Sequence, residues 1–175
     1  EALGGDVIQF DEPAFNVFMD DVKEWGIAAL ERAAAGLKCA TAVHICYGYG
    51  IEANVKWKET LGSEWRQYEE IFPAINRSRI GQVSLECASS KVPISLIRLL
   101  SDKTILVGAI DVATSSIETP EQVTATLASA LQHADAARIQ ACTNCGLAPL
   151  SRPVAEAKLA ALGAGARLMR KTHKR

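Results

Sequence analysis

Short apolar runs alternate with longer amphipathic stretches along the whole chain. The runs are rich in aliphatic and β-branched residues, which is typical of buried strands, and the stretches between them are long enough for helices. Thr119-Pro120-Glu121 is typical of a helix start, because a capping side chain precedes a proline in the first turn. The predicted strands are residues 7–10, 41–46, 82–85, 104–110 and 138–141, and the predicted helices are residues 19–35, 63–76, 94–100, 119–133 and 153–168.

Five strand–helix units in a row predict an α/β protein with a parallel sheet covered by helices. A doubly wound open sheet and a TIM (β/α)8 barrel both have this pattern. No glycine-rich phosphate turn follows a strand, as a Rossmann domain would require. Each strand instead ends near polar or reactive residues, and in a barrel the strand ends share one mouth, where active sites lie. The pattern therefore favours the barrel.

The number of units limits how much of a barrel the chain can form. Five units fall short of eight, and 175 residues fall short of the roughly 250 of a typical barrel. We therefore expect residues 1–175 to be the C-terminal part of a single catalytic TIM-barrel domain, about its last five β/α units. The rest would lie upstream or on a separate chain.

The composition limits which binding partners and which cellular compartment we expect. The net charge of −1 gives no reason to expect nucleic acid or an anionic membrane as a partner, and no apolar run approaches the roughly 20 residues of a membrane span. The first residues lack a signal-peptide pattern. Five cysteines are an odd number, and they are too sparse for a disulfide scaffold, so we expect reduced thiols in a cytoplasmic protein. Such thiols are free to bind a metal.

His44 and Cys46 form the strongest local signal. Two residues apart on a strand, their side chains lie on the same face, so an imidazole and a thiolate converge on one point. Zinc favours such nitrogen and sulfur donors. A buried His and a buried Cys, each satisfied locally, are the alternative, and for so short a motif they are the more common case.

Further candidates lie at the ends of other predicted strands. Cys142 and Cys145 form a C-x-x-C motif, which alone indicates a redox pair or half of a zinc knuckle. No second C-x-x-C follows, so we interpret Cys145 as a candidate ligand at the mouth and Cys142 as a residue of the core or one that supports the ligands. Glu86 ends a strand, and Asp11 begins the turn Asp11-Glu12-Pro13. Both carboxylates have an ordinary alternative, as solvated or turn-forming residues.

Five segments together resemble the catalytic barrel of the cobalamin-independent methionine synthase family. They follow one another in the order known for that family and cover most of the chain, which makes the resemblance more specific than any one motif. The segments are IQFDEPAF (8–15), HICYG (44–48), SLECASS (84–90), LVGAIDVAT (106–114) and TNCGLAPLSR (143–152).

The resemblance implies a reaction and a set of residues. The reaction is zinc-dependent transfer of a methyl group to the thiol of homocysteine, which forms methionine. The implied zinc ligands are His44, Cys46, Glu86 and Cys145, and the implied residue for the amino group of homocysteine is Asp11. Glu86, the hard oxygen donor, is the ligand we expect to move when the substrate sulfur enters.

The chain departs from the family pattern on the side that would bind the methyl donor. Ala113 stands where the family commonly has a histidine for proton transfer, and Val17 stands where classical members have a glutamate that contacts folate. Asp111 is the candidate to serve in proton transfer instead. The connection from Cys46 to Glu86 is longer than in classical members and rich in Trp and Tyr. This pattern is similar to that of short, single-barrel members, so we expect a folate or corrinoid methyl donor and a partner protein that delivers the methyl group.

Two other functions remain open from the sequence. A metal-free barrel enzyme resembling uroporphyrinogen decarboxylase would need arginines at the mouth, whereas the arginines here lie mainly in predicted helices and in the tail. A non-catalytic zinc-binding module would bind the metal without responding to homocysteine.

Overall fold

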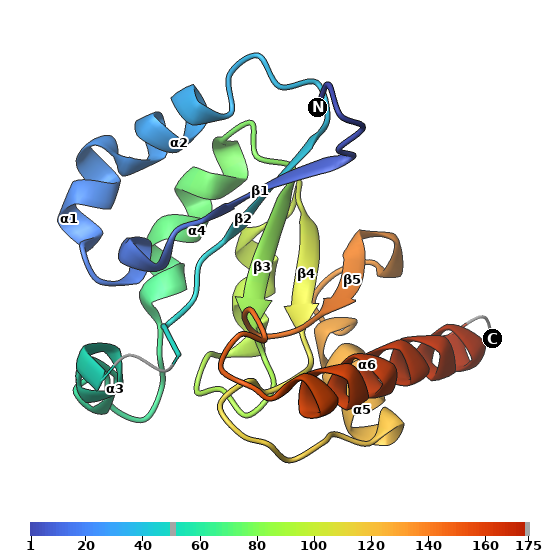
Figure 1. Ribbon diagram of the computed structural model, residues 1–175. Helices are drawn as coiled ribbons and strands as arrows, with labels where there is room; N and C mark the ends of the chain where they lie inside the picture. The colour runs from blue at the N-terminus through green and yellow to red at the C-terminus, as the bar shows by residue number, and fades with distance from the viewer. Residues whose placement is uncertain (50–51, 174–175) are drawn as a thin grey trace.

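The computed structural model describes residues 1–49 and 52–173, and its centre is one five-stranded parallel sheet (Figure 1). The strands are β1 (Val7–Asp11), β2 (Ala40–His44), β3 (Gln82–Glu86), β4 (Thr104–Gly108) and β5 (Ile139–Cys142). They lie side by side in chain order, β1-β2-β3-β4-β5, and every neighbouring pair is parallel. A doubly wound sheet reverses its strand order, so within the described residues that alternative is excluded.

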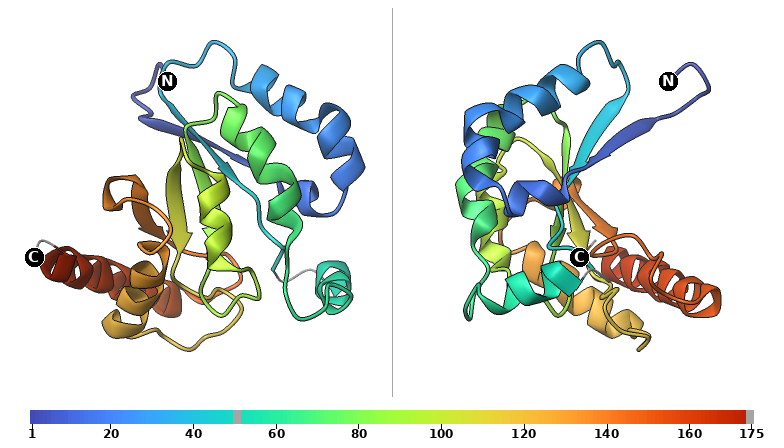
Figure 2. Two further views of the ribbon diagram at one scale, coloured as in Figure 1. Left: turned by 180° about the vertical axis from the view of Figure 1, so that it is seen from behind. Right: turned by 60° about the vertical axis from the view of Figure 1, so that its left-hand side comes forward.

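Helices connect successive strands, as the alternating pattern predicts. Figure 2 shows α1, α2 and α4 gathered on the same side of the sheet. The chain from α1 to α2 runs through a π-helical stretch, η2, and the predicted helix after β3 is a 3₁₀ helix, η3. The elements are η1 (Pro13–Asn16), α1 (Met19–Asp21), η2 (Val22–Gly26), α2 (Ile27–Ala33), α3 (Glu52–Glu59), α4 (Gln67–Arg77), η3 (Ile94–Leu99), α5 (Pro120–Ala130), η4 (Ala136–Arg138) and α6 (Arg152–His173).

The central strands β3 and β4 are buried in the core. Val83 and Leu85 on β3 and Ile105 and Val107 on β4 are all 0% exposed. Adjacent residues of a strand point to opposite faces, so burial at both Leu85 and the neighbouring Ser84 means that both faces of β3 are covered. The expected parallel sheet is therefore confirmed. Its carboxyl ends, where the candidate site residues lie, meet along one edge.

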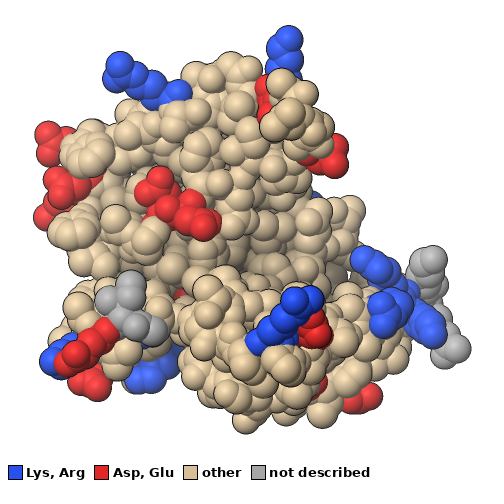
Figure 3. All heavy atoms as spheres, in the orientation of Figure 1, with Lys and Arg blue, Asp and Glu red and all other residues tan. Residues whose placement is uncertain are grey.

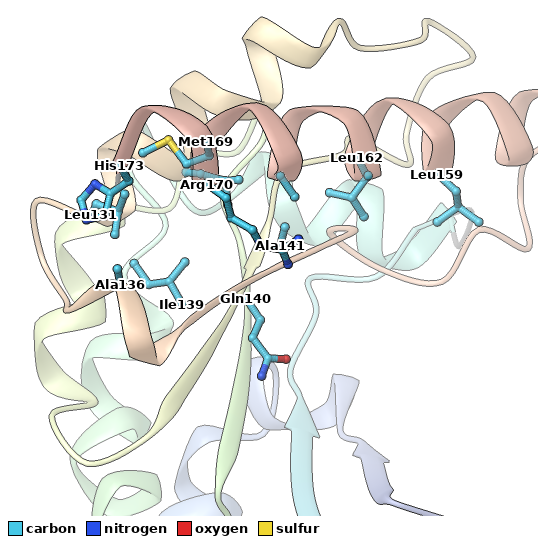
Figure 4. A pocket seen from close by; sticks show the side chains of 13 residues that line it. Leu131, Ala136, Ile139, Gln140, Ala141, Leu159, Leu162, Met169, Arg170 and His173 are labelled. Atoms are coloured by element: carbon cyan, nitrogen blue, oxygen red, sulfur yellow. The ribbon is translucent and has the colours of Figure 1, made fainter. Parts of the chain in front are cut away.

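The two outer strands differ from the central ones. β1 alternates between exposed and half-buried residues, and β5 has no fully buried residue. A groove of about 640 Å³ runs between β5 and α6, lined by Ile139, Leu162 and Met169 among others (Figure 4). A second groove, of about 520 Å³, lies beside η1, α1 and α2. The described residues therefore form a partial barrel with two open edges, and the first of the two grooves adjoins the edge at β5.

Candidate metal centre

One imidazole and two thiols meet at the carboxyl end of the sheet. His44 is the last residue of β2, Cys46 follows two positions later, and Cys145 lies three positions beyond β5. One donor atom from each of these side chains lies within 4.8 Å of the other two. Two donor atoms bonded to one zinc ion at about 2.0–2.3 Å can be at most about 4.6 Å apart, so the three side chains need only a small shift, if any, to bind one cation. We call these residues the donor triplet.

The imidazole of His44 presents one nitrogen that has no partner. Its Nδ1 lies 2.8 Å from the hydroxyl of Ser84, the residue that pairs with His44 across β2 and β3. Its Nε2 is buried and has no hydrogen-bond partner in the described part of the chain. A buried polar atom without a partner is unfavourable, and metal-binding histidines commonly use one ring nitrogen for the metal and the other for such a neighbour. The residues present therefore fit a metal ion bound at Nε2.

The two thiols of the donor triplet differ in acidity. The hydrogen bond from Cys46 is the main reason that the pKa of Cys145 falls to about 7, although burial opposes it. The same hydrogen bond, together with burial, raises the pKa of Cys46 well above its usual range. Burial disfavours the charged form of His44, but the interactions with Cys46, Asp11 and Glu86 outweigh it and raise the pKa of His44. Cys145 is thus the thiol that ionises first, and a thiolate is the form that binds metal.

Glu86, the fourth implied ligand, is close to the donor triplet but outside it. Its side chain is 1% exposed, and its charge influences the pKa values of His44 and Cys145. The Tyr47 backbone N–H donates to its Oε1 at 2.8 Å, and the Tyr49 hydroxyl donates to its Oε2 at 2.9 Å. Burial raises the pKa of Glu86, while these two hydrogen bonds oppose the rise. The carboxylate therefore faces the segment after β2.

Asp11 lies at the open part of the same mouth. It is the last residue of β1 and pairs with His44 across β1 and β2. Its side chain is exposed and accepts a hydrogen bond from Gln9 Nε2 at 2.8 Å. Figure 3 shows acidic side chains over the carboxyl end of β1, on the face that carries the mouth. A free carboxylate at this place can bind a cationic group.

Asp111 lies in the loop after β4, and side chains hold it through its backbone. The Asp111 N–H donates to Glu118 Oε1 at 2.9 Å, and the Asp111 carbonyl accepts from Lys158 Nζ at 2.8 Å. Lys158 is 0% exposed and forms an ion pair with Glu118 at 2.9 Å. The carboxylate of Asp111 accepts from the Ala113 N–H at 2.8 Å, and its charge influences the pKa of Tyr49. Asp111 lies outside the donor triplet.

Asn144 is a site residue that sequence reasoning did not single out. It is 0% exposed, and its Oδ1 accepts from the N–H groups of Cys87 and Ala88 at 3.2 and 3.3 Å. Its Nδ2 donates to the Ala88 carbonyl at 2.7 Å. It also packs on Gly108, where a Cβ would come within 2.5 Å of Asn144 Oδ1. Asn144 thus ties the ends of β3 and β4 to the segment that carries Cys145.

Ser84 and Cys142 lie beside the donor triplet. The residue type of Ser84 gave no sign of its contact with His44, because a serine in an apolar strand is usually a packing residue. Ser84 also hydrogen-bonds Cys142, and this lowers the pKa of that thiol, although burial is the larger effect and raises it overall to about 12. In the sequence, only the position of Asn144 within C-T-N-C, next to Cys145, could have drawn attention to it.

The described helices were also compared with the requirements of a membrane span. Within residues 1–49 and 52–173, no helix is both long enough and apolar enough to cross a bilayer.

The chain is similar in sequence to curated methionine synthases. A methionine synthase of Saccharolobus islandicus (strain L.S.2.15 / Lassen #1) is 29% identical over 174 residues, which are 98% of this chain and 47% of that protein. The methionine synthase of Sulfurisphaera tokodaii is 29% identical over 168 residues, covering 95% of this chain and 44% of that protein. The chain thus spans about half the length of the curated relatives it matches.

Solved structures agree in fold. A B12-independent methionine synthase from Shewanella sp. W3-18-1, solved in complex with selenomethionine, has a TM-score of 0.93 and 61% identity, covering 98% of this chain and 50% of that one. The structure described as a putative vitamin-B12-independent methionine synthase from Listeria monocytogenes has a TM-score of 0.62 at 14% identity, which is a likeness of fold alone.

The family assignment rests on a match to a family model. Residues 1–167 match the family described as "Cobalamin-independent synthase, Catalytic domain". This match covers nearly the whole chain, and it agrees with the donor triplet and with the sequential parallel sheet. The chain therefore belongs to the cobalamin-independent methionine synthase family and forms part of its catalytic domain.

Proposed function

We propose that the protein transfers a methyl group to the thiol of homocysteine at a bound zinc ion and forms methionine. The observation that carries this proposal is the donor triplet, with the buried and unpaired Nε2 of His44 beside the thiols of Cys46 and Cys145. The Shewanella relative was solved with selenomethionine, the selenium analogue of the proposed product, which supports the same substrate class.

Zinc is the metal that best suits one imidazole and two thiolates, because these are its preferred donors in proteins. When bound, zinc lowers the pKa of a coordinated thiol and so makes a nucleophile available near neutral pH. His44, Cys46 and Cys145 would hold the ion. Glu86 would supply the fourth, exchangeable oxygen ligand.

The remaining roles fall to carboxylates at the mouth. Asp11, exposed beside His44, would bind the ammonium group of homocysteine and orient the amino acid. Asp111 would serve in proton transfer, since Ala113 carries no ionisable group at the position where the family commonly has histidine. The backbone of Asp111 is fixed by Glu118 and Lys158, which gives its carboxylate a defined place.

The methyl donor is a folate or a corrinoid in our proposal, with delivery by a partner protein. Val17 is 41% exposed, so an apolar side chain stands at the surface where classical members place the glutamate that contacts folate. This replacement supports a donor other than the polyglutamylated folate of classical members. We further propose that the protein acts in the cytoplasm, where its thiols stay reduced.

We propose that the complete catalytic domain is a closed TIM barrel, of which residues 1–175 form about the last five units. Two features support this. The outer strands β1 and β5 have unpaired edges within the described residues, and two grooves lie open, one beside β5 and one beside η1, α1 and α2. Three further β/α units would pair with both edges and cover both grooves.

The metal-free decarboxylase alternative loses its basis, because it leaves the meeting of His44, Cys46 and Cys145 unexplained. The non-catalytic zinc module differs from our proposal in one measurable respect. X-ray absorption of the bound zinc should change on adding homocysteine if a substrate sulfur enters the metal's ligand set. An unchanged spectrum would favour the non-catalytic module.

The test of the proposed function uses the full-length protein. It is offered homocysteine with methyltetrahydrofolate, in monoglutamyl and polyglutamyl forms, and with methylcobalamin, and methionine is measured together with zinc content. We expect one zinc per chain, and we expect Cys145→Ser to lose both the zinc and the methionine formation. Cys39→Ser is the matched control, because Cys39 lies outside the donor triplet. Full activity or full zinc content in Cys145→Ser would overturn the assignment.

A further inference from the structure

Glu86 lies on the same face of the sheet as His44. Residues two apart on a strand point to one face, so Glu86 points the same way as Ser84 on β3. Ser84 pairs with His44 across β2 and β3, and its hydroxyl lies 2.8 Å from the imidazole. The carboxylate of Glu86 is therefore the next polar group of β3 toward the mouth, on the face where the donor triplet meets.

The hydrogen bonds on Glu86 leave about half of its acceptor positions free. An ionised carboxylate has about four lone-pair positions, two on each oxygen. The Tyr47 backbone N–H uses one position on Oε1, and the Tyr49 hydroxyl uses one on Oε2. Because the side chain is 1% exposed, almost no water competes for the others. One lone pair on each oxygen is thus available to a metal ion.

The hydroxyl of Tyr49 is itself fixed from two sides. Asn144 Nδ2 donates to it at 3.4 Å, from the residue directly before Cys145. Lys58 Nζ lies 4.7 Å from the centroid of the Tyr49 ring, in a cation–π contact. The same ammonium group donates to the Gly48 carbonyl at 2.8 Å. The hydroxyl therefore lies between the end of β3 and the segment that carries Cys145.

Helix α3 supports this arrangement from the other side of the turn. Gly48 has a φ of +74°, a conformation that favours glycine, and a Cβ there would lie 1.9 Å from Asn54 Nδ2. Asn54 and Lys58 both lie on α3, one turn apart, and both contact the turn. None of the residues of α3 is fully buried, so the helix contributes little to the core. Its contacts indicate that it holds Tyr49 in place.

We propose that Tyr49 is a positioning residue of the metal centre, whose hydroxyl holds the buried Glu86 carboxylate so that its free lone pairs face the ion bound by the donor triplet. The inference rests on the proposed function, because it takes the donor triplet and Glu86 to be the metal site. Carboxylates that bind metals are commonly held by such hydrogen-bond donors behind them. Without the hydroxyl, the Glu86 side chain can turn about its own bonds, and the metal loses a ligand that is already oriented.

The test measures metal affinity, so it does not depend on turnover. Zinc affinity of the full-length Tyr49→Phe protein is determined by competition with a chromophoric chelator, and bound Co²⁺ is observed by its visible absorption. We expect zinc to bind about tenfold more weakly, the lower end of the effect typical of residues behind metal ligands. The Co²⁺ spectrum should shift in the same direction as that of Glu86→Ala, because both substitutions weaken the same oxygen ligand.

Two comparisons separate this role from a general effect on structure. Tyr47→Phe removes a hydroxyl that donates to Gln67 at 3.0 Å and leaves the Tyr47 N–H on Glu86, so its zinc affinity should match that of the unsubstituted protein. In a Glu86→Ala background, Tyr49→Phe should cause no further loss of affinity, because the carboxylate that the hydroxyl holds is gone.

The possible results distinguish this inference from the proposed function. Unchanged or tighter zinc binding by Tyr49→Phe, or an equal loss in the Glu86→Ala background, overturns the inference while the proposed function stands. Failure of the unsubstituted full-length protein to bind zinc would instead overturn the proposed function, and the role of Tyr49 with it.

Discussion

Two polar clusters lie at the carboxyl end of the same sheet, and they differ in whether their polar atoms have partners. In the donor triplet, His44 Nε2 is buried without a partner. In the loop after β4, Lys158 is 0% exposed, yet its ammonium group donates to Glu118 and to the carbonyls of Asp111 and Ser116. An incomplete buried cluster indicates a place where a ligand is bound, whereas a complete one indicates a structural role. We therefore infer that the donor triplet serves to bind a ligand and that the cluster around Lys158 serves to stabilise the fold.

The strongest test of this division is Lys158→Met, which leaves the Glu118 carboxylate half-buried without its cation. Breaking a buried ion pair by removing one partner typically costs about 3–5 kcal/mol in the free energy of unfolding. We expect a loss near the lower end of that range, since Glu118 keeps some exposure. Urea denaturation measures it.

The control for that substitution is Lys171→Met, on the exposed last turn of the same helix. It should change the free energy of unfolding by less than about 0.5 kcal/mol. If Lys158→Met lowered the free energy of unfolding by no more than this control, the cluster around Lys158 would not stabilise the fold.

Cys46→Ser should have the opposite effect: it should weaken zinc binding and leave the stability of the metal-free protein nearly unchanged. Removal of a metal ligand should lower zinc affinity more than about 100-fold, beyond the range typical of residues that only support a ligand. The metal-free protein should unfold at nearly the same urea concentration as before. Chelator competition and urea titration of the metal-free protein check the two halves of this prediction, and a large stability loss without metal would contradict it.

Ser84→Ala is a finer probe of the donor triplet. It removes the hydroxyl 2.8 Å from His44 Nδ1, so the imidazole loses the partner that fixes its orientation. We expect a fall in zinc affinity of about tenfold, as is typical when such a supporting residue is lost. The neighbouring Ser90→Ala, whose hydroxyl contacts only the Val92 N–H among the described residues, should leave the affinity unchanged.

The smallest effect we expect is a change in the pH dependence of zinc binding. Zinc requires thiolates, so it must displace the proton of Cys46, whose pKa is raised, throughout the neutral range. Below the pKa of about 7 of Cys145, a second proton must also leave, and His44, whose pKa is raised, must lose its proton as well wherever it is charged. The logarithm of the affinity should therefore rise by about one unit per pH unit above pH 7 and more steeply below it. A pH-independent affinity would argue against the thiol ligands.

Much of the fold could be predicted because its causes are local in the sequence. The run that became β4, TILVG, is almost entirely apolar, and β3, QVSLE, carries Val83 and Leu85 in the buried core. The rule that parallel strands end on the same edge predicted that His44, Cys46 and Cys145 lie at one mouth, and the family resemblance then singled them out as metal ligands. Helix α3 was not predicted, because none of its residues is fully buried and its sequence lacks an apolar stripe.

The parts of the site that escaped prediction depend on contacts between distant segments. The direction of Glu86 is set by Tyr49, which comes from a connection whose course cannot be read from residue types. Lys158 looks like a surface lysine of an amphipathic helix, yet its partners, among them Glu118, come from the loop about 40 residues earlier. Such pairs become visible only when the helix is placed against the sheet.

The close approach of Asn144 to Gly108 has a consequence for how this sequence can change. Any side chain at position 108 would collide with the amide that joins three strand ends, and a smaller residue at position 144 would leave the Cys87 and Ala88 N–H groups without their acceptor. A Cβ at position 108 would also lie 2.7 Å from the Leu85 carbonyl oxygen and 2.9 Å from Asn144 Cα, so a change of the side chain at position 144 does not make room for it. In a saturation substitution library, position 108 should therefore remain glycine whatever residue occupies position 144.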